Sequence, residues 1–209
     1  MVEAFGFVSG GLQVIGYLLY IQKTLKKETE PNPTSWLMFA YGTLLITVLE
    51  WDKDASWGLL ALPIACSFSS IVVALICFFR GTIVWPRHGL DKWAFLADVA
   101  VMAGYIATYV AIQSTFIDST TKNFLVSLFL IIGSGSTIFA FIPMIREMWT
   151  GENKEHQAPW TVWTCAYCAL TITTFIEGPR WELYIYPISC FFLHLLMVLG
   201  IWRGERRGT

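Results

Sequence analysis

Seven runs of apolar residues constrain this chain more than any other feature of its sequence. Each run is close to the length that an α-helix needs to cross a hydrocarbon core of about 30 Å. The runs cover Ala4 to Ile21, Ser35 to Leu49, Trp57 to Phe79, Lys92 to Ile112, Phe124 to Ile145, Trp160 to Ile176 and Leu183 to Trp202. Only 14% of the residues are charged, against about 25% in an ordinary soluble domain. The sequence therefore predicts an all-α membrane protein with seven transmembrane helices in the lipid bilayer.

The basic residues are distributed unevenly between the two sides that these runs define. Three of the 14 Lys and Arg residues, namely Lys53, Lys122 and Arg180, fall on one side, and the others fall on the opposite side. Because Lys and Arg are enriched in cytoplasmic loops, this split predicts a cytoplasmic carboxyl terminus and an amino terminus outside. All ten Trp residues stand at or near the ends of runs, where an amphipathic ring prefers the headgroup level.

A repeat relates the two halves of the chain. The sequence Pro63-Ile64-Ala65-Cys66 returns as Pro187-Ile188-Ser189-Cys190. Further matches at nearly the same spacing pair Trp57 with Trp181, Trp36 with Trp163, Glu50 with Glu177, Arg80-Gly81 with Arg203-Gly204 and Gly10 with Gly133. These matches predict two parallel copies of a three-helix unit, at residues 1–81 and 119–209, joined by one linker helix within residues 82–118. Parallel repeats of this kind occur in transporters, with the solute near the membrane midplane.

The arrangement of three, one and three helices with an outside amino terminus resembles the PQ-loop superfamily, over nearly all of residues 4 to 203. That superfamily includes the SWEET sugar transporters, lysosomal amino-acid exporters and the KDEL receptor. Its Pro-Gln signature is partly present here: Phe141-Ile142-Pro143-Met144 keeps the proline, and Tyr20-Ile21-Gln22-Lys23 keeps the glutamine. The resemblance implies a transporter for a small-molecule solute that alternates access between two triple-helix bundles.

The sugar-transporting relatives carry an asparagine in the third helix of each repeat, and often a tryptophan. The asparagines here, Asn32, Asn123 and Asn153, lie in loops or at a helix start. We therefore expect a uniporter or proton-coupled carrier for a small polar, zwitterionic or cationic solute, with sugar disfavoured. The alternative within the resemblance is a receptor, like the KDEL receptor, that binds a ligand without transport.

Polar residues in mid-membrane are costly and usually face a bundle interior or a water-filled cavity. Ser70 and His194 match in the repeat near the centres of their runs, and His194 could bind solute or relay a proton. The alternative is a neutral histidine that is hydrogen-bonded to a neighbouring helix. Other candidates for the same cavity, each of which could instead serve helix packing, are Ser67, Gln13, Ser136, Tyr41, Tyr167, Thr47 and Thr174. Pro143, Gly133 and Gly135 are predicted flexing points.

Glu50 and Glu177 occupy matched positions at the outer ends of their runs and are predicted to form an acidic outer vestibule. Such a vestibule attracts cations, although solvated loop charge explains the same residues. Asp98 lies within the fourth run, where it could pair with a basic residue or take part in gating.

Other functional classes are disfavoured by the sequence. A net charge of −1 argues against a nucleic-acid partner. Cys165 and Cys168 have the spacing of half a zinc site, but the second half is lacking, so no metal is expected. No group of catalytic residues converges at one depth, so we expect neither an enzyme nor a cofactor. Assembly into a homo-oligomer stays open.

Overall fold

The computed structural model describes residues 2–80, 89–113, 118–150, 154–178 and 180–207, and these residues form helices and connecting turns without a strand. The helices are α1 (Val2–Leu25), α2 (Pro33–Asp52), α3 (Trp57–Phe79), α4 (Gly89–Gln113), α5 (Ser119–Thr150), α6 (Gln157–Glu177), the 3-10 helix η1 (Trp181–Tyr184) and α7 (Ile185–Arg207). The prediction of an all-α fold is confirmed.

Polar caps fix where three of the helices begin. The Asn32 carboxamide oxygen accepts a hydrogen bond from the backbone N–H of Ser35, and Pro33 occupies the first turn of α2. Ser56 caps α3 and His156 caps α6 in the same way. Each cap satisfies a backbone donor that the first turn of a helix leaves without an intrahelical partner.

Five helical segments of the described chain are long and apolar enough to cross a membrane. They are Glu3–Leu25, Trp57–Phe79, Gly89–Ala111, Thr120–Thr150 and Trp181–Gly204. Large apolar side chains are exposed on the outside of the bundle, including Phe68 at 70% and Phe79 at 81%. Soluble proteins rarely expose contiguous apolar surface of this kind, so the molecule fits an integral membrane protein.

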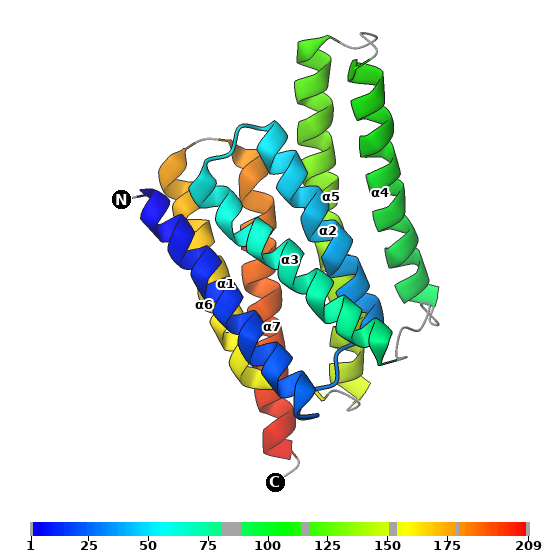
Figure 1. Ribbon diagram of the computed structural model, residues 1–209, viewed down its shortest axis with the longest axis vertical. Helices are drawn as coiled ribbons and strands as arrows, with labels where there is room; N and C mark the ends of the chain where they lie inside the picture. Colours follow the sequence, from blue (N-terminus) through cyan, green and yellow to red (C-terminus); the bar gives the residue numbers. More distant parts are fainter. Residues whose placement is uncertain (1, 81–88, 114–117, 151–153, 179, 208–209) are drawn as a thin grey trace.

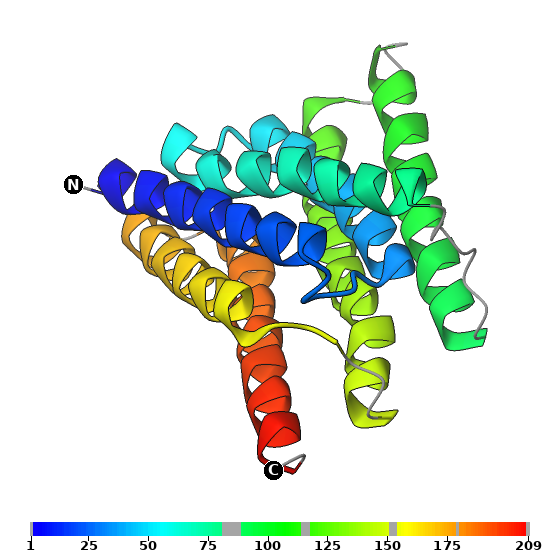
Figure 2. The ribbon, with the colours of Figure 1, turned by 60° about the horizontal axis from the view of Figure 1, so that its bottom comes forward.

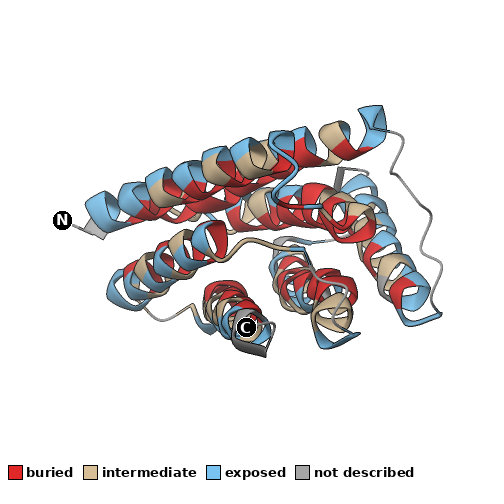
Figure 3. Ribbon diagram, turned by 90° about the horizontal axis from the view of Figure 1, so that it is seen from below, coloured by how far each residue is buried: buried red, intermediate tan, exposed pale blue. Residues whose placement is uncertain are grey.

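We call α1, α2 and α3 the first helix group and α5, α6 and α7 the second helix group (Figures 1 and 2). In the first helix group, α3 contacts both α1 and α2, and in the second helix group, α7 contacts both α5 and α6. The groups meet where α1 lies against α6 and where α2 lies against α5. Helix α4 packs on the flank of the bundle, against α5 and a small part of α2. Buried residues line the faces that the helices turn toward one another (Figure 3).

Candidate functional site

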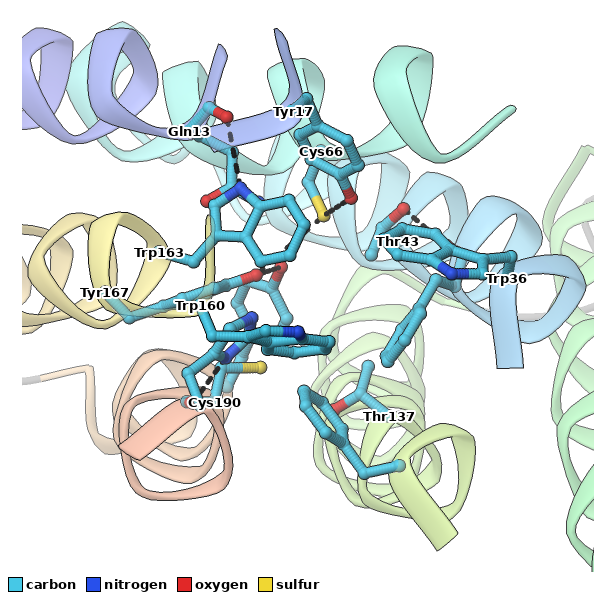
Figure 4. Close-up of a pocket in the computed structure, with 14 residues that line it drawn as sticks. Gln13, Tyr17, Trp36, Thr43, Cys66, Thr137, Trp160, Trp163, Tyr167 and Cys190 are labelled. Carbon is cyan, nitrogen blue, oxygen red and sulfur yellow. Dashed lines mark hydrogen bonds between the residues drawn. The ribbon is translucent and has the colours of Figure 1, made fainter. Parts of the chain in front are cut away.

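A cavity lies between the first and second helix groups (Figure 4). Its volume is about 20 Å³, which is room for about one water molecule. Its lining comes from α1, α2 and α3 on one side and from α5, α6 and α7 on the other: Gln13, Tyr17, Trp36, Phe39, Thr43, Cys66, Thr137, Phe141, Trp160, Trp163, Tyr167, Tyr186, Cys190 and His194.

Three tryptophans form the most apolar part of the cavity wall. Trp36, Trp160 and Trp163 are each 1% exposed, and the rings of Trp36 and Trp163 are 6.0 Å apart between centroids. These three rings therefore face the bundle interior and not lipid, while the predicted depth of the tryptophans near the membrane interface stays a prediction. A ring one turn inside a capped helix can point inward as well as outward, and sequence position does not distinguish the two. Trp51, Trp57, Trp93, Trp149, Trp181 and Trp202 are exposed, as the interface prediction requires.

Gly16 lets α1 approach the Trp163 ring. A Cβ atom at position 16 would overlap the indole of Trp163, whose N–H donates to the backbone carbonyl of Gln13 at 3.2 Å. The tryptophan of one helix group is thus held directly against the backbone of the other.

His194 lies inside a cage of aromatic rings from α5 and α6. The centroids of Phe141, Trp160, Trp163 and Tyr167 are between 4.6 and 6.0 Å from its own. Its Nδ1 is 2.7 Å from the carbonyl oxygen of Cys190, one turn earlier in α7. Since a carbonyl oxygen only accepts, Nδ1 carries the hydrogen in this contact, and the neutral ring therefore presents Nε2 as an acceptor.

Phenolic hydroxyls connect the cavity wall across the two helix groups. The Tyr17 hydroxyl lies 2.5 Å from Ser70 Oγ, and the Tyr167 hydroxyl lies 2.8 Å from the Tyr186 hydroxyl. Tyr167 also donates to the sulfur of Cys66 at 3.8 Å, from the second helix group to the first. The predicted residue Ser70 is therefore behind the cavity wall and positions Tyr17, whereas Tyr167 is part of the wall.

Gln13 supplies an acceptor that is not used within the protein. The side chain is 1% exposed, and its Oε1 makes no hydrogen bond to any described residue. A buried acceptor without a partner costs about 1–3 kcal/mol. Because Gln13 lines the cavity, a bound molecule can relieve that cost.

A hydrogen-bonded cluster around Glu155, which we call the Glu155 gate, adjoins the cavity through Trp160, which belongs to both. The Glu155 carboxyl accepts from the Tyr20 hydroxyl at 2.8 Å and from the Trp160 indole at 3.1 Å. Tyr20 in turn accepts from the Trp36 indole at 3.0 Å. Nearby, the Asn32 amide donates to Glu147 at 2.5 Å. These bonds join α1 and α2 to α5, α6 and the segment between them.

Glu155 lies outside the helices, in the segment before α6, and burial raises its pKa to about 8. The donors Tyr20 and Trp160 lower the pKa, and the neighbouring carboxylate of Glu147 raises it. Desolvation is the largest of these effects because it disfavours the charged carboxylate. The gate therefore holds a carboxyl group that changes charge near neutral pH.

A second cluster, which we call the Lys53 gate, joins the two helix groups at the other ends of α2 and α5. The Lys53 ammonium contacts Glu182 in η1 at 3.3 Å and donates to Ser127 in α5 at 2.9 Å. Arg180 donates to the backbone carbonyl of Lys53. Ser56 donates to Glu177 at 2.5 Å. This gate also joins the first helix group to the second.

The remaining predicted residues lie away from the cavity. Ser67 donates to the carbonyl of Pro63 and contacts Thr47, and Thr174 donates to the carbonyl of Leu170. These contacts match the packing alternative. Tyr41 faces α4, where its hydroxyl donates to the carbonyl of Phe95.

The two predicted vestibule carboxylates differ in their surroundings. Glu50 is buried at 4% exposure, whereas Glu177 is exposed and bonded to Ser56. Asp98 is buried in α4. The side chain of Ser136 lies outside the described residues.

Helix α5 runs unbroken through the predicted flexing points. Gly133, Gly135 and Pro143 all lie within Ser119–Thr150. A Cβ atom at Gly135 would meet nothing within 4 Å, so space alone does not require glycine there. Their role in flexing stays a prediction.

Gln13, Tyr167 and His194 are the predicted site residues that line the cavity, and eleven lining residues were not predicted. One signal was present: Trp36 and Trp163 match in the repeat, as do Cys66 and Cys190. Nothing in their spacing distinguishes a ring in a cavity from a ring in the interface. Only the structure shows which way these side chains point from their helices.

Comparisons of the chain with protein-family models, with curated proteins and with solved structures find no match.

Proposed function

We propose that this protein is a membrane carrier that moves a small polar or cationic solute by alternating access between the two helix groups. The observation that carries the proposal is a small cavity lined from both groups, with a polar cluster that joins the groups at each end of the bundle. A cavity with room for about one water molecule admits a larger solute only when one gate opens. Opening one gate while the other stays intact gives access from one side at a time.

The helix contacts support the proposed repeat. Exchanging α1, α2 and α3 for α5, α6 and α7 turns each principal contact within one group into a contact within the other. The same exchange turns the contact of α1 with α6 into that of α5 with α2. With α4 as linker, this pattern agrees with the resemblance to the PQ-loop superfamily. In this proposal α2 and α6 also span the membrane, shielded by their more apolar neighbours.

The charge distribution supports a sidedness for the gates. If the basic side is cytoplasmic, the Glu155 gate faces the cytoplasm and the Lys53 gate faces outside. A carboxyl group with a pKa near 8 in the inner gate makes proton coupling a natural feature of this carrier.

Solute uptake into reconstituted vesicles tests the proposal. Candidate amines, amino acids and sugars are presented to vesicles with wild-type protein, with His194→Ala and with Trp163→Leu. Trp93→Leu is the matched control, because Trp93 is 73% exposed on α4, away from the cavity. Saturable uptake that both cavity variants reduce at least tenfold, and the control does not, supports the carrier.

Absence of saturable uptake for every class of solute contradicts transport. Saturable binding by the same preparation without uptake would instead indicate a receptor of this fold. Equal loss of uptake in all three variants would argue against this cavity as the solute path.

A further inference from the structure

We infer that the cavity binds a small organic cation with at least one N–H group, that is, a protonated alkylamine. This inference names the solute class and rests on the proposed function only in taking the cavity as the binding site. It follows from which hydrogen-bonding groups around the cavity are already used and which are not.

The donors of six lining side chains are committed to partners inside the protein. The indole N–H groups of Trp36, Trp160 and Trp163 donate to Tyr20, Glu155 and the Gln13 carbonyl. The hydroxyls of Thr43 and Thr137 donate to backbone carbonyls in their own helices. The Nδ1 hydrogen of His194 is held by the carbonyl of Cys190. A ligand that needs donors from the wall, such as an anion, finds few of them.

Two lining side chains keep an unused acceptor, and the amide nitrogen of Gln13 adds a donor beside one of them. Gln13 Oε1 is buried without a partner among the described residues. His194 presents the lone pair of Nε2, because its other ring nitrogen carries the hydrogen. Both side chains line the same cavity, one from each helix group. A ligand must therefore bring hydrogen-bond donors to these two acceptors.

The rest of the wall favours positive charge on that ligand. Trp36, Trp163, Tyr17 and Tyr167 line the space, and an aromatic face attracts a cation within about 6 Å of the ring centre. The described lining contains no Lys or Arg to repel a cation and no Asp or Glu to hold a fixed ion pair. A cation is thus held by rings and two neutral acceptors, which leaves it able to dissociate.

A neutral sugar fits this lining less well. Each sugar hydroxyl both donates and accepts, and burying it without both partners costs free energy. The wall offers acceptors but has already used the donors named above. The lining therefore discriminates by hydrogen-bond direction as well as by charge.

Equilibrium binding to the purified protein in detergent tests the inference independently of transport. The probes are the chlorides of methylammonium, dimethylammonium, trimethylammonium and tetramethylammonium, with D-glucose as a neutral comparison, measured by titration calorimetry at neutral pH. Trimethylammonium keeps one N–H and tetramethylammonium keeps none, so we expect trimethylammonium to bind about tenfold more tightly. Gln13→Leu should reduce that preference, and Trp163→Phe should weaken all four cations because Trp is the strongest cation–π partner.

Two results overturn the inference. One is binding of D-glucose that is tighter than binding of every ammonium probe. The other is equal affinity for trimethylammonium and tetramethylammonium in the wild type, unchanged by Gln13→Leu. Thermal unfolding of each variant identifies any that fail to fold, and Gln13→Met, which keeps the length of the side chain, then replaces Gln13→Leu. Ammonium binding without uptake refutes the carrier but not the inferred ligand class. Sugar uptake without ammonium binding refutes the inferred ligand class but not the carrier.

Discussion

The Glu155→Gln substitution should remove a pH dependence from the opening of the Glu155 gate. In the closed structure burial raises the pKa of Glu155 to about 8. Opening exposes the carboxyl to water, where its pKa returns to about 4.3. Between these two values the closed gate holds a proton that the open gate releases, so a rise in pH favours opening. Glutamine cannot ionise, so the substituted gate should open at every pH only as readily as the wild-type gate opens at low pH.

The magnitude follows from the separation of the two pKa values. Opening becomes about tenfold more favourable for each pH unit between roughly pH 4.3 and pH 8. From pH 5 to pH 8 this amounts to on the order of 4 kcal/mol, and outside that window the dependence levels off. The other charged groups near the carboxyl are Glu147, which raises its pKa, and the adjacent Lys154, which is paired with Glu30.

Cysteine modification measures gate opening. Cys66 lines the cavity and is 4% exposed, so maleimide reaches it only after a gate opens. In a variant that keeps Cys66 alone, the rate of modification is compared with and without Glu155→Gln from pH 5 to pH 9. The rate without Glu155→Gln is divided by the rate with it, so that the pH dependence of thiol ionisation, which is common to both, cancels. This ratio should rise with pH and reach a plateau above about pH 8.

Glu28→Gln is the matched control for this measurement, since Glu28 is an exposed carboxylate on the same side and is paired with Lys23. It should leave the pH profile of Cys66 modification unchanged. A ratio that stays constant from pH 5 to pH 9 would refute the reasoning about the Glu155 gate.

Three further substitutions probe the packing and the gates. Gly16→Ala should displace the Trp163 ring, lower thermal stability in detergent by roughly 1–3 kcal/mol and weaken ligand binding, whereas Gly11→Ala, with open space at its Cβ, should do neither. Lys53→Met should leave Glu182 and Ser127 without their ammonium partner and raise the maleimide reactivity of Cys190; unchanged reactivity would count against the Lys53 gate. Gly135→Ala should slow solute uptake without lowering thermal stability if α5 flexes there, and normal uptake would remove Gly135 from the flexing points.

Much of the fold could be predicted from the sequence because lipid imposes simple rules on helix length and composition. Apolar runs, interface tryptophans and basic loops all depend on local residue type. The all-α fold follows from such features and is confirmed, and five of the seven predicted spans are described helices long and apolar enough to cross a membrane. The repeat also rests on local identity, namely the return of the Pro63 segment at Pro187.

The site was harder to predict because it depends on which face of a helix points inward. Trp36 and Trp163 fit the interface rule by position, yet their helices turn them toward the cavity. Conversely, Ser67 and Thr174 are polar and buried, but a hydrogen bond to their own helix backbone satisfies each of them. The criterion of polarity in mid-membrane therefore predicted serines and threonines that do not line the cavity. It did not predict most of the aromatic residues that do.

Gln13 and His194 were predicted because they are polar residues within apolar runs, at positions that match Ser136 and Ser70 in the repeat. In each case the structure leaves one acceptor directed to no protein partner. For His194, the predicted alternatives were a binding role and a hydrogen bond to a neighbouring helix. Its Nδ1 contacts its own helix instead, so Nε2 is left available for a ligand.

Distances between spin labels on the two helix groups test alternating access most directly. One pair, at Lys26 and Thr150, reports on the end with the Glu155 gate, and the other, at Trp51 and Thr121, reports on the end with the Lys53 gate; all four positions are exposed. Labels are introduced as cysteines in a cysteine-free background, and the distances are measured at pH 5 and pH 8, with and without trimethylammonium. The account predicts that the distance at one end lengthens while the other stays short, and that the two ends are never open together. Distances that stay fixed under every condition, or that lengthen at both ends at once, would contradict it.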